Sequence, residues 1–241
     1  YGDHRDLHLS IRRQRQMCIR DRSTFDEVAH RVPLRSLDNA FDMDELRAWS
    51  ERVLRRLDDD PVPAWACELK FDGLAVSLRY EDGHLVQAAT RGDGRVGEDV
   101  TANVRTINDV PDRLSDGAPA VVEVRGEVYM GRSAFEALNA AQAATGERAY
   151  VNPRNTAAGS LRQKDAAVTA TRDLSFWAYQ LGEMVGGPDL SSHGDTLAWL
   201  STLGLSVNEH LYRFTDFDEV VAHVAGVEDS RHDLDLSLIH I

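Results

Sequence analysis

Residues 65–90 read WACELKFDGLAVSLRYEDGHLVQAAT, and this stretch decides the expected fold. Three runs within it are short and rich in apolar residues, as strands are: Trp65–Lys70, Leu74–Tyr80 and Leu85–Thr90. Between the last two lies Glu81-Asp82-Gly83, a tight-turn signal that predicts an antiparallel hairpin. Strands joined by hairpins, with helices appended to them, indicate an α+β fold rather than a doubly wound parallel sheet.

Helices are expected on both sides of this stretch, at residues 42–57, 133–145, 196–203 and 217–227. In the first, apolar side chains recur at helical spacing, and Asp42 with Glu45 resembles a capping pair. The second is expected to stop at Gly146, since glycine is the residue that most often ends a helix.

Two further strands are expected at residues 121–129 and 174–181. In the second, Phe176-Trp177-Ala178-Tyr179 alternates across the strand, so Trp177 and Tyr179 share one face. We assign that face to the core, although an aromatic pair of this kind can also stack on a nucleobase.

The composition excludes several classes of protein. The chain has 241 residues, a formal net charge of −13 and 42% hydrophobic residues, which is typical of a globular protein. The acidic balance argues against a stand-alone nucleic-acid binder that works by bulk charge. No apolar run approaches the roughly 18 residues that a membrane span needs, so no membrane partner is expected. The only cysteines, Cys18 and Cys67, cannot form a disulfide scaffold, which fits a reducing compartment.

The two ends of the chain are interpreted as sequence of foreign origin. Residues 17–22 read Met-Cys-Ile-Arg-Asp-Arg, and residues 236–241 read Leu-Ser-Leu-Ile-His-Ile. Opposite strands of one short DNA can encode both, and that DNA resembles a transposon-end adapter. We therefore expect residues 1–23 and 236–241 to be adapter artefact and residues 24–235 to be part of one domain.

The segment Glu68-Leu69-Lys70-Phe71-Asp72-Gly73 contains side chains that can take part in catalysis. Side chains two apart on a strand project to one face, so Glu68 and Lys70 should share a face, joined by Asp72 if the strand extends that far. A lysine can serve as an amine nucleophile, whereas arginine can only pair with an anion. Because the chain has just one other lysine, Lys164, among its 27 basic residues, a lysine here is informative. The plain alternative is a Lys–Glu pair on a solvated sheet face.

Lys70-x-Asp72-Gly73 matches the signature of the covalent nucleotidyltransferases, which include DNA ligases, RNA ligases and mRNA capping enzymes. The segments around it resemble one branch, the bacterial NAD-dependent DNA ligases. In chain order they are Ser36-Leu37-Asp38-Asn39, Thr90-Arg91-Gly92-Asp93-Gly94, Gly97-Glu98-Asp99, Glu123-Val124-Arg125-Gly126-Glu127, Asn152-Pro153-Arg154-Asn155 and Ala157-Ala158-Gly159-Ser160-Leu161-Arg162-Gln163.

The resemblance implies that residues 24–235 are a partial adenylation domain, with an antiparallel-sheet, ATP-grasp-like covalent nucleotidyltransferase fold and flanking helices. In that family the motif lysine attacks the adenylyl phosphorus of NAD, releases nicotinamide mononucleotide and keeps AMP as a phosphoramidate. AMP then passes to the 5′-phosphate at a DNA nick, which is sealed. Carried over by motif, Lys70 would be the nucleophile, and Asp72 would orient it and help it lose its proton.

The nucleoside half of the substrate is assigned by the same resemblance. Glu68 would recognise the adenine amino group, and Ser36 and Leu37 would line the adenine site. Arg91 and Glu127 would hold the ribose side.

Arg154 and Arg162 would contact the phosphates and the nicotinamide mononucleotide. Arginine suits this role because its guanidinium makes planar, bidentate contacts to phosphate oxygens. Mg²⁺ is the expected helper, since the leaving group and the trapped AMP are both anionic. The expected partner of the full-length enzyme is nicked double-stranded DNA. The enzyme is expected to be monomeric, cytoplasmic and associated with the bacterial nucleoid.

Three alternatives stay open at this point. Gly92-x-Gly94-x-x-Gly97 matches the dinucleotide fingerprint in form, but that fingerprint needs a parallel βαβ unit, and the strand before it is the return arm of a hairpin. We therefore expect a glycine-rich loop at the nucleotide site. An ATP- or GTP-using relative would share Lys-x-Asp-Gly. A non-catalytic nucleotide-binding fragment is possible because the family's nicotinamide mononucleotide module and its later domains lack counterparts here, so this fragment alone is not expected to seal nicks.

Overall fold

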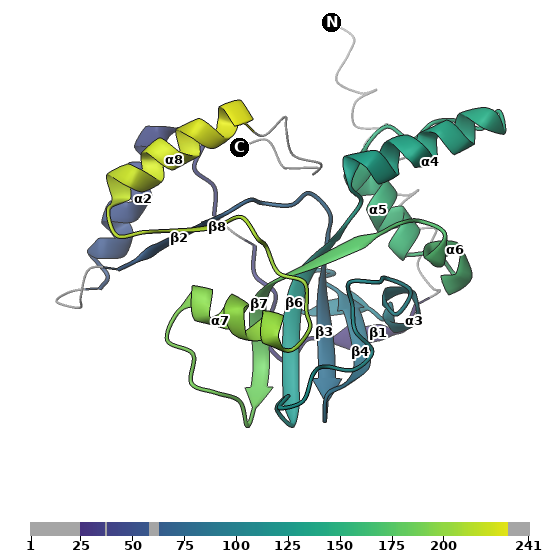
Figure 1. The fold of residues 1–241 in the computed structure, drawn as a ribbon, viewed down its shortest axis with the longest axis horizontal. Helices are drawn as coiled ribbons and strands as arrows, with labels where there is room; N and C mark the ends of the chain where they lie inside the picture. Colours follow the sequence, from purple (N-terminus) through teal and green to yellow (C-terminus); the bar gives the residue numbers. More distant parts are fainter. Residues whose placement is uncertain (1–24, 37, 58–62, 231–241) are drawn as a thin grey trace, which may run out of the picture.

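The computed structural model describes residues 25–36, 38–57 and 63–230 (Figure 1). The predicted foreign termini, residues 1–23 and 236–241, lie outside the described residues, as does Leu37. The central element is a four-stranded antiparallel sheet with the strand order β4-β3-β6-β7. Its strands are β3 (Leu74–Glu81), β4 (His84–Thr90), β6 (Val121–Tyr129) and β7 (Ser175–Val185).

The predicted hairpin is confirmed. Strands β3 and β4 pair antiparallel up to Glu81 and His84, and Asp82 and Gly83 form the turn between them. Both turn residues have positive φ, 48° and 77°, which a two-residue turn matching the twist of the strands requires. Antiparallel pairing throughout this sheet, with helices packed against it, confirms the α+β class.

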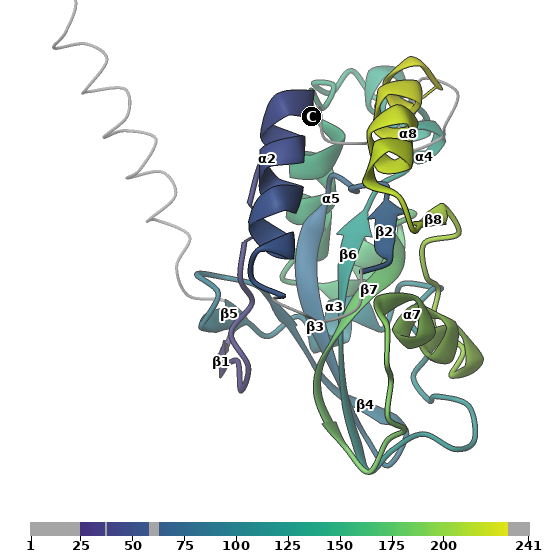
Figure 2. The same cartoon turned by 90° about the vertical axis from the view of Figure 1, so that its left-hand side faces the viewer.

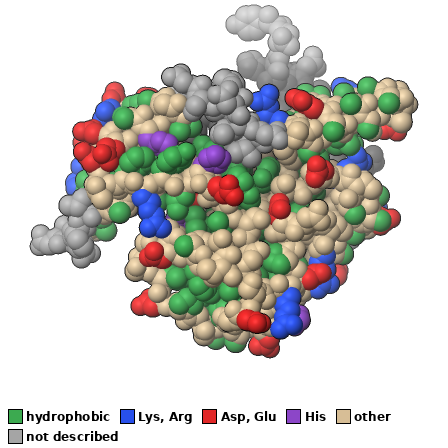
Figure 3. Space-filling view, in the orientation of Figure 1, with side chains coloured by type: hydrophobic (Ala, Val, Ile, Leu, Met, Phe, Trp, Pro, Cys, Tyr) green, Lys and Arg blue, Asp and Glu red, His purple; other side chains and the backbone are tan. Residues whose placement is uncertain are grey.

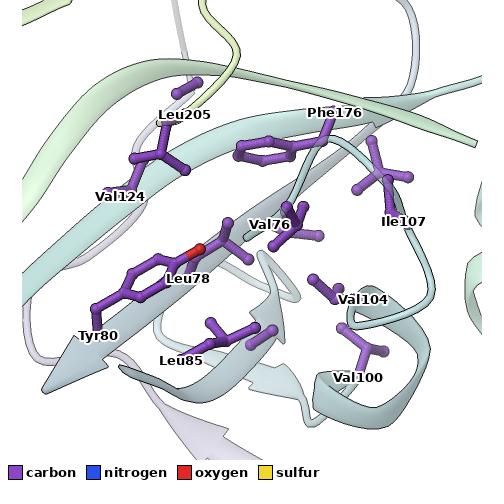
Figure 4. Close-up of a cluster of buried hydrophobic side chains, with 14 of the residues drawn as sticks. Val76, Leu78, Tyr80, Leu85, Val100, Val104, Ile107, Val124, Phe176 and Leu205 are labelled. Atoms are coloured by element: carbon purple, nitrogen blue, oxygen red, sulfur yellow. The ribbon is translucent and has the colours of Figure 1, made fainter. Parts of the chain in front are cut away.

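One face of this sheet carries the hydrophobic core (Figure 4). Alternate residues of β3, namely Val76, Leu78 and Tyr80, are fully buried there. They pack with apolar side chains from helices α3 (Thr101–Val104), α5 (Pro153–Leu161) and α7 (His193–Thr202). The buried Tyr80 hydroxyl donates to the Pro111 carbonyl at 3.0 Å, so its polar end is satisfied. The opposite face of the sheet is not part of this core.

Two small sheets lie beside the central one. Strand β1 (Glu27–Ala29) pairs with β5 (Val96–Glu98), and β2 (Trp65–Glu68) pairs with β8 (Leu211–Phe214), both antiparallel. Helices α2 (Met43–Leu54) and α8 (Phe217–Ser230) lie side by side over the β2–β8 pair (Figures 1 and 2). Trp49, Trp65 and Phe217 join these elements, with ring centroids 4.8 to 6.4 Å apart. This aromatic cluster fixes β2, which leads directly into the Lys70 segment.

The helix predictions are confirmed, with shifted bounds. In α2 the Glu45 N–H donates to Asp42 Oδ1 at 2.8 Å, as the capping pair predicts, but the helix ends at Leu54. Helix α4 (Arg132–Ala144) begins after Gly131 and ends before Gly146, whose φ is 73°. Helices α3, α5 and α6 (Ala166–Ala170) are not among the predicted elements.

None of the described helices has the length and apolar character needed to cross a membrane. On the face shown in Figure 3, acidic and basic side chains are scattered rather than gathered into a basic patch. This agrees with the acidic composition of the chain.

Candidate active site

An open cavity of about 1430 Å³ lies against the polar face of the central sheet. Its walls come from the end of β2, the β4–β5 loop, β6, β7, α5 and the first residue of α7. Seven of the nine predicted site residues line it: Ser36, Glu68, Lys70, Arg91, Glu127, Arg154 and Arg162. Asp72 lies beside the lining residues, and Leu37 lies outside the described residues.

Strand alternation explains why this face is polar. Along β6, Val122, Val124 and Val128 point into the core and are fully buried. The intervening Arg125 and Glu127 point to the other face and line the cavity. The charged side chains that line the cavity and the apolar side chains of the core therefore lie on opposite faces of the same sheet.

Lys70 reaches the cavity by a different route from the one predicted. Strand β2 ends at Glu68, so Lys70 lies in the connection that follows, although both residues line the cavity. Phe71 fixes this connection, because its buried ring lies 4.2 Å from the Trp177 ring and 5.3 Å from the Tyr129 ring, centroid to centroid. Lys70 itself is exposed and makes no ion pair within 4.0 Å among the described residues.

Asp72 is paired with an arginine. Its Oδ1 lies 3.4 Å from Arg154 Nε, which donates a hydrogen bond to the Gly73 carbonyl at 3.2 Å. Asp72 Oδ1 is buried and accepts no hydrogen bond from a described residue. The strand does not extend to Asp72, so the predicted shared face of Glu68, Lys70 and Asp72 is not formed by strand geometry.

Glu127 has a perturbed carboxyl group. Burial raises its pKa from 4.5 to about 7, against the opposing attraction of Lys70 and Arg154. Its Oε1 accepts the Gly73 N–H at 3.2 Å, a contact that also favours the charged form. A carboxyl group poised near neutrality, close enough to Lys70 to interact with it electrostatically, is typical of a reactive site.

Glu68 meets a residue that the sequence did not indicate. His193 Nε2, at the start of α7, lies 2.5 Å from Glu68 Oε2. The hydrogen bond to Glu68 raises the pKa of His193. The two residues are 125 positions apart, and no motif or spacing connects them.

Two of the cavity arginines belong to the edge formed by α5 and the glycine-rich loop. Arg162 forms an ion pair with Glu98, with Nε 2.6 Å from Oε2. Arg91 begins the loop, where a side chain at Gly92 would place its Cβ 1.8 Å from the Val96 carbonyl oxygen. The predicted glycine-rich loop therefore borders the cavity, and it follows an antiparallel strand rather than a parallel βαβ unit.

The assignment of Trp177 and Tyr179 to the core is wrong. The core is filled by the alternate residues Phe176 and Ala178, both fully buried, while Trp177 and Tyr179 line the cavity. Alternation correctly predicts that the pair shares a face, but either face of this strand has the aromatic residues a core needs. Burial raises the pKa of Tyr179 to about 12, so its hydroxyl stays protonated beside the cavity.

Two further cavity residues were missed. Arg125 is buried, pairs with Glu123 at 3.2 Å and donates to the Val32 carbonyl at 2.6 Å. Asn208 donates to the Leu69 carbonyl at 3.4 Å, next to Lys70. Arg125 stands inside a quoted motif, whereas Asn208 carries no local signal. Together the lining residues offer a free amine, several arginines and an aromatic wall, which suit a phosphorylated, ring-containing ligand.

Comparison with known proteins agrees with this chemistry. The family model described as NAD-dependent DNA ligase adenylation domain matches residues 22–239. A protein named DNA ligase from Chloroflexus aurantiacus (strain ATCC 29366 / DSM 635 / J-10-fl) is 52% identical over 223 residues, which cover 88% of this chain and 31% of that protein. The DNA ligase of Shouchella clausii (strain KSM-K16) is 48% identical, over 88% of this chain and 31% of its own length.

A third relative, the DNA ligase of Brucella melitensis biotype 2 (strain ATCC 23457), is 50% identical over 90% of this chain. The chain spans about 31% of the length of such relatives, so the match is to one domain of a longer protein. The match favours the NAD-using branch over the ATP- or GTP-using alternative. This chain belongs to the family of NAD-dependent DNA ligase adenylation domains.

Proposed function

We propose that this domain captures the adenylyl group of NAD on Lys70 as the first stage of DNA ligation by a longer protein. The observation that carries the proposal is the placement of Lys70. Its exposed amine faces a cavity that is also lined by Arg91, Arg154 and Arg162. An amine nucleophile among phosphate-binding groups is the arrangement that phosphoryl-type transfer needs.

In the proposed step, Lys70 Nζ attacks the adenylyl phosphorus of NAD. A P–N bond forms, the P–O bond to nicotinamide mononucleotide breaks, and the nucleotide leaves with the bonding electron pair. The lysine must first lose a proton from its ammonium group. Asp72 and Glu127 are the nearby carboxylates that could receive it, and Glu127, whose pKa lies near 7, is suited to exchange protons at neutral pH.

The other lining residues would bind and orient the substrate. Arg154 and Arg162 would neutralise charge on the phosphates and on the leaving nucleotide, with Arg162 exchanging its Glu98 partner for the ligand. Glu68 and Ser36 would hold the adenine, and Arg91 and Glu127 would hold the ribose side. We also assign Leu37 to the adenine site, because it belongs to the same motif as Ser36, its neighbour in the sequence.

Mg²⁺ is also part of the proposal. Among the described residues no group of three or more His, Cys, Asp and Glu side chains could hold a metal by itself. Mg²⁺, however, is commonly bound by one or two carboxylates together with substrate phosphates and water. The buried Asp72 Oδ1, which accepts no hydrogen bond from a described residue, suits such a role, as does the neighbouring Glu127. When bound, Mg²⁺ would neutralise negative charge on the phosphate oxygens.

For the whole protein, we propose that AMP passes from Lys70 to the 5′-phosphate at a nick in double-stranded DNA. Support comes from the relatives, which are named DNA ligases. We further propose that the protein works as a monomer in the bacterial cytoplasm, on the DNA of the nucleoid. The net charge of −13 suggests that most of the grip on DNA comes from parts outside this domain.

The test is transfer of label to Lys70. The chain, and the full-length parent protein, are incubated with NAD labelled in the adenylate. Label on Lys70 is then sought that survives alkali and is released by acid or acidic hydroxylamine, as a P–N bond requires. Lys70→Arg should abolish labelling, since the charge survives but the nucleophile does not. Lys164→Arg is the matched control and should be labelled normally. Label from ATP but not from NAD would contradict the choice of donor, and an unlabelled full-length parent would contradict the mechanism.

A further inference from the structure

The contact between His193 and Glu68 links helix α7 to the end of strand β2. His193 is the first residue of α7, and Ser192 caps the helix by accepting the Asp195 N–H at 3.1 Å. The cap fixes the backbone of His193, and its Nε2 lies 2.5 Å from Glu68 Oε2. Both side chains line the cavity, with 38% of His193 and 21% of Glu68 exposed.

The two oxygens of Glu68 are in different states. Oε2 is held by His193, whereas Oε1 is buried and has no hydrogen-bond partner among the described residues. A buried carboxylate oxygen without a donor is costly, so it favours a ligand that brings an N–H group. The same oxygen repels a ligand that presents a carbonyl oxygen there.

His193 is the only described residue that forms a hydrogen bond with the Glu68 side chain. The terminal torsion of a glutamate is broad, so a carboxylate without an anchor turns readily. Loss of the imidazole would therefore let Glu68 rotate and would admit water to either oxygen. The orientation of the acceptor depends on a residue that does not itself need to touch the base.

We propose that His193 is a positioning residue for base recognition, which holds the Glu68 carboxylate so that Oε1 accepts a hydrogen bond from a 6-aminopurine and rejects a 6-oxopurine. The inference rests on the proposed function, because it takes the adenine half of the substrate to lie against Glu68. It goes further by assigning the selectivity between adenine and hypoxanthine to a pair of residues rather than to Glu68 alone.

The experiment measures the affinity of the chain for AMP and for inosine monophosphate, which differs by a 6-oxo group in place of the 6-amino group. Quenching of tryptophan fluorescence is a suitable signal, because Trp177 lines the cavity. In His193→Ala, the preference for AMP should fall about tenfold, the size expected for one charge-assisted hydrogen bond. His193→Gln should keep most of the preference, because its amide N–H can reach Glu68 in place of the imidazole Nε2. His84→Ala, at an exposed histidine of β4, is the matched control and should behave as the wild type.

A double-mutant cycle separates positioning from a general loss of structure. If His193 acts through Glu68, then His193→Ala should cause no further loss of preference in a Glu68→Ala background. At saturating NAD, the rate of Lys70 labelling in His193→Ala should match the wild type, while the NAD concentration for half-saturation rises.

An unchanged AMP preference in folded His193→Ala would overturn the inference while leaving Lys70 labelling, and so the proposed function, intact. An equal loss in the Glu68→Ala background would also overturn it, since His193 would then act independently. A wild-type chain that binds neither nucleotide, together with a full-length parent that carries no label on Lys70, would overturn both proposals. Thermal unfolding of each variant confirms that it is folded, and His193→Gln supplies the comparison if His193→Ala is not.

Discussion

The backbone N–H of Gly73 donates to Glu127 Oε1 across 3.2 Å, while the carbonyl of the same glycine accepts from Arg154 Nε at 3.2 Å. Both polar groups of this glycine are therefore held by cavity side chains, one from β6 and one from α5. Since Gly73 comes three residues after Lys70, the clamp restricts where the amine can lie. Preorganisation of this kind lowers the entropic cost of bringing the nucleophile to a substrate.

Glu127 should make the stability of the fold depend on pH. Burial raises its pKa in the folded chain from 4.5 to about 7, so the folded chain binds this proton more tightly than the unfolded chain. The resulting stabilisation is fully present below pH 4.5 and is lost as the pH rises through about 7. Glu127→Gln removes this dependence. The free energy of unfolding of the variant, taken relative to that of the wild type, should therefore rise by about 3 kcal/mol from pH 4.5 to pH 8.

Urea unfolding at pH 4.5, 6 and 8 measures this difference. Glutamine is the suitable replacement because its amide keeps an oxygen that can accept the Gly73 N–H. Glu136→Gln, at an exposed glutamate of α4, is the control and should follow the wild type. Parallel stability curves for Glu127→Gln and the wild type would show that burial does not raise the pKa of Glu127.

Gly73→Ala should damage the fold and the site together. A Cβ at this position would lie 2.1 Å from the Val128 carbonyl oxygen, a backbone atom that cannot move aside easily. We expect a loss of roughly 1–3 kcal/mol of stability, as for other overpacked sites, and slower labelling of Lys70. Gly159→Ala is the matched control for stability, since it lies in helix α5 with open space around it and should gain up to about 1 kcal/mol.

Thermal unfolding and the label assay check both glycine-to-alanine variants. A Gly73→Ala variant with normal stability and normal labelling would contradict the view that this glycine is needed for close packing against β6.

Arg125 should be needed for stability because it is the ion-pair partner of the buried Glu123. Arg125 and Glu123 are both 4% exposed, and Arg125 Nε lies 3.2 Å from Glu123 Oε1. Arg125→Ala leaves Glu123 buried and unpaired, for which we expect a loss of about 3–5 kcal/mol. The double variant Glu123→Gln/Arg125→Met should lose much less, because no unpaired charge remains.

The same arginine also donates to the carbonyls of Val32 and Pro33, in the segment that leads to Ser36. Both Arg125 variants should therefore bind AMP more weakly, even where the double variant recovers stability. Recovery of AMP affinity along with stability in the double variant would show that this tether plays no part in binding.

Phe71 should anchor the Lys70 connection by packing rather than by charge. Its ring is 7% exposed and packs edge-on to Trp177, with centroids 4.2 Å apart. Phe71→Ala should cost about 3–5 kcal/mol of stability and slow Lys70 labelling, while Phe71→Leu should cost less. Phe41→Ala is the control, because Phe41 is 79% exposed and its removal should change neither quantity. Normal labelling in Phe71→Ala would show that the position of Lys70 does not depend on this ring.

Local signals in the sequence predict the local features of the fold well. The turn at Asp82 and Gly83, the cap at Asp42 and the stop at Gly146 each depend on a few neighbouring residues, and all three are present. Helix α5 was missed, although Asn152 caps it by accepting the Asn155 N–H and Pro153 stands in its first turn. Its glycine- and alanine-rich composition has no clear apolar stripe, so periodicity gave no signal there.

The sequence by itself determined the reactive motif around Lys70, the hairpin that follows it and the family to which the domain belongs, because these depend on residues close together in the chain. Only the tertiary structure decided which face of β7 forms the cavity, since alternation defines two faces but not which one meets the other half of the core. It also decided the pairing of β2 with β8 and of Glu68 with His193, residues 125 positions apart. Such contacts arise from how whole elements pack, so no local pattern in the sequence could reveal that the proposed base-recognising carboxylate depends on a histidine at the start of a distant helix.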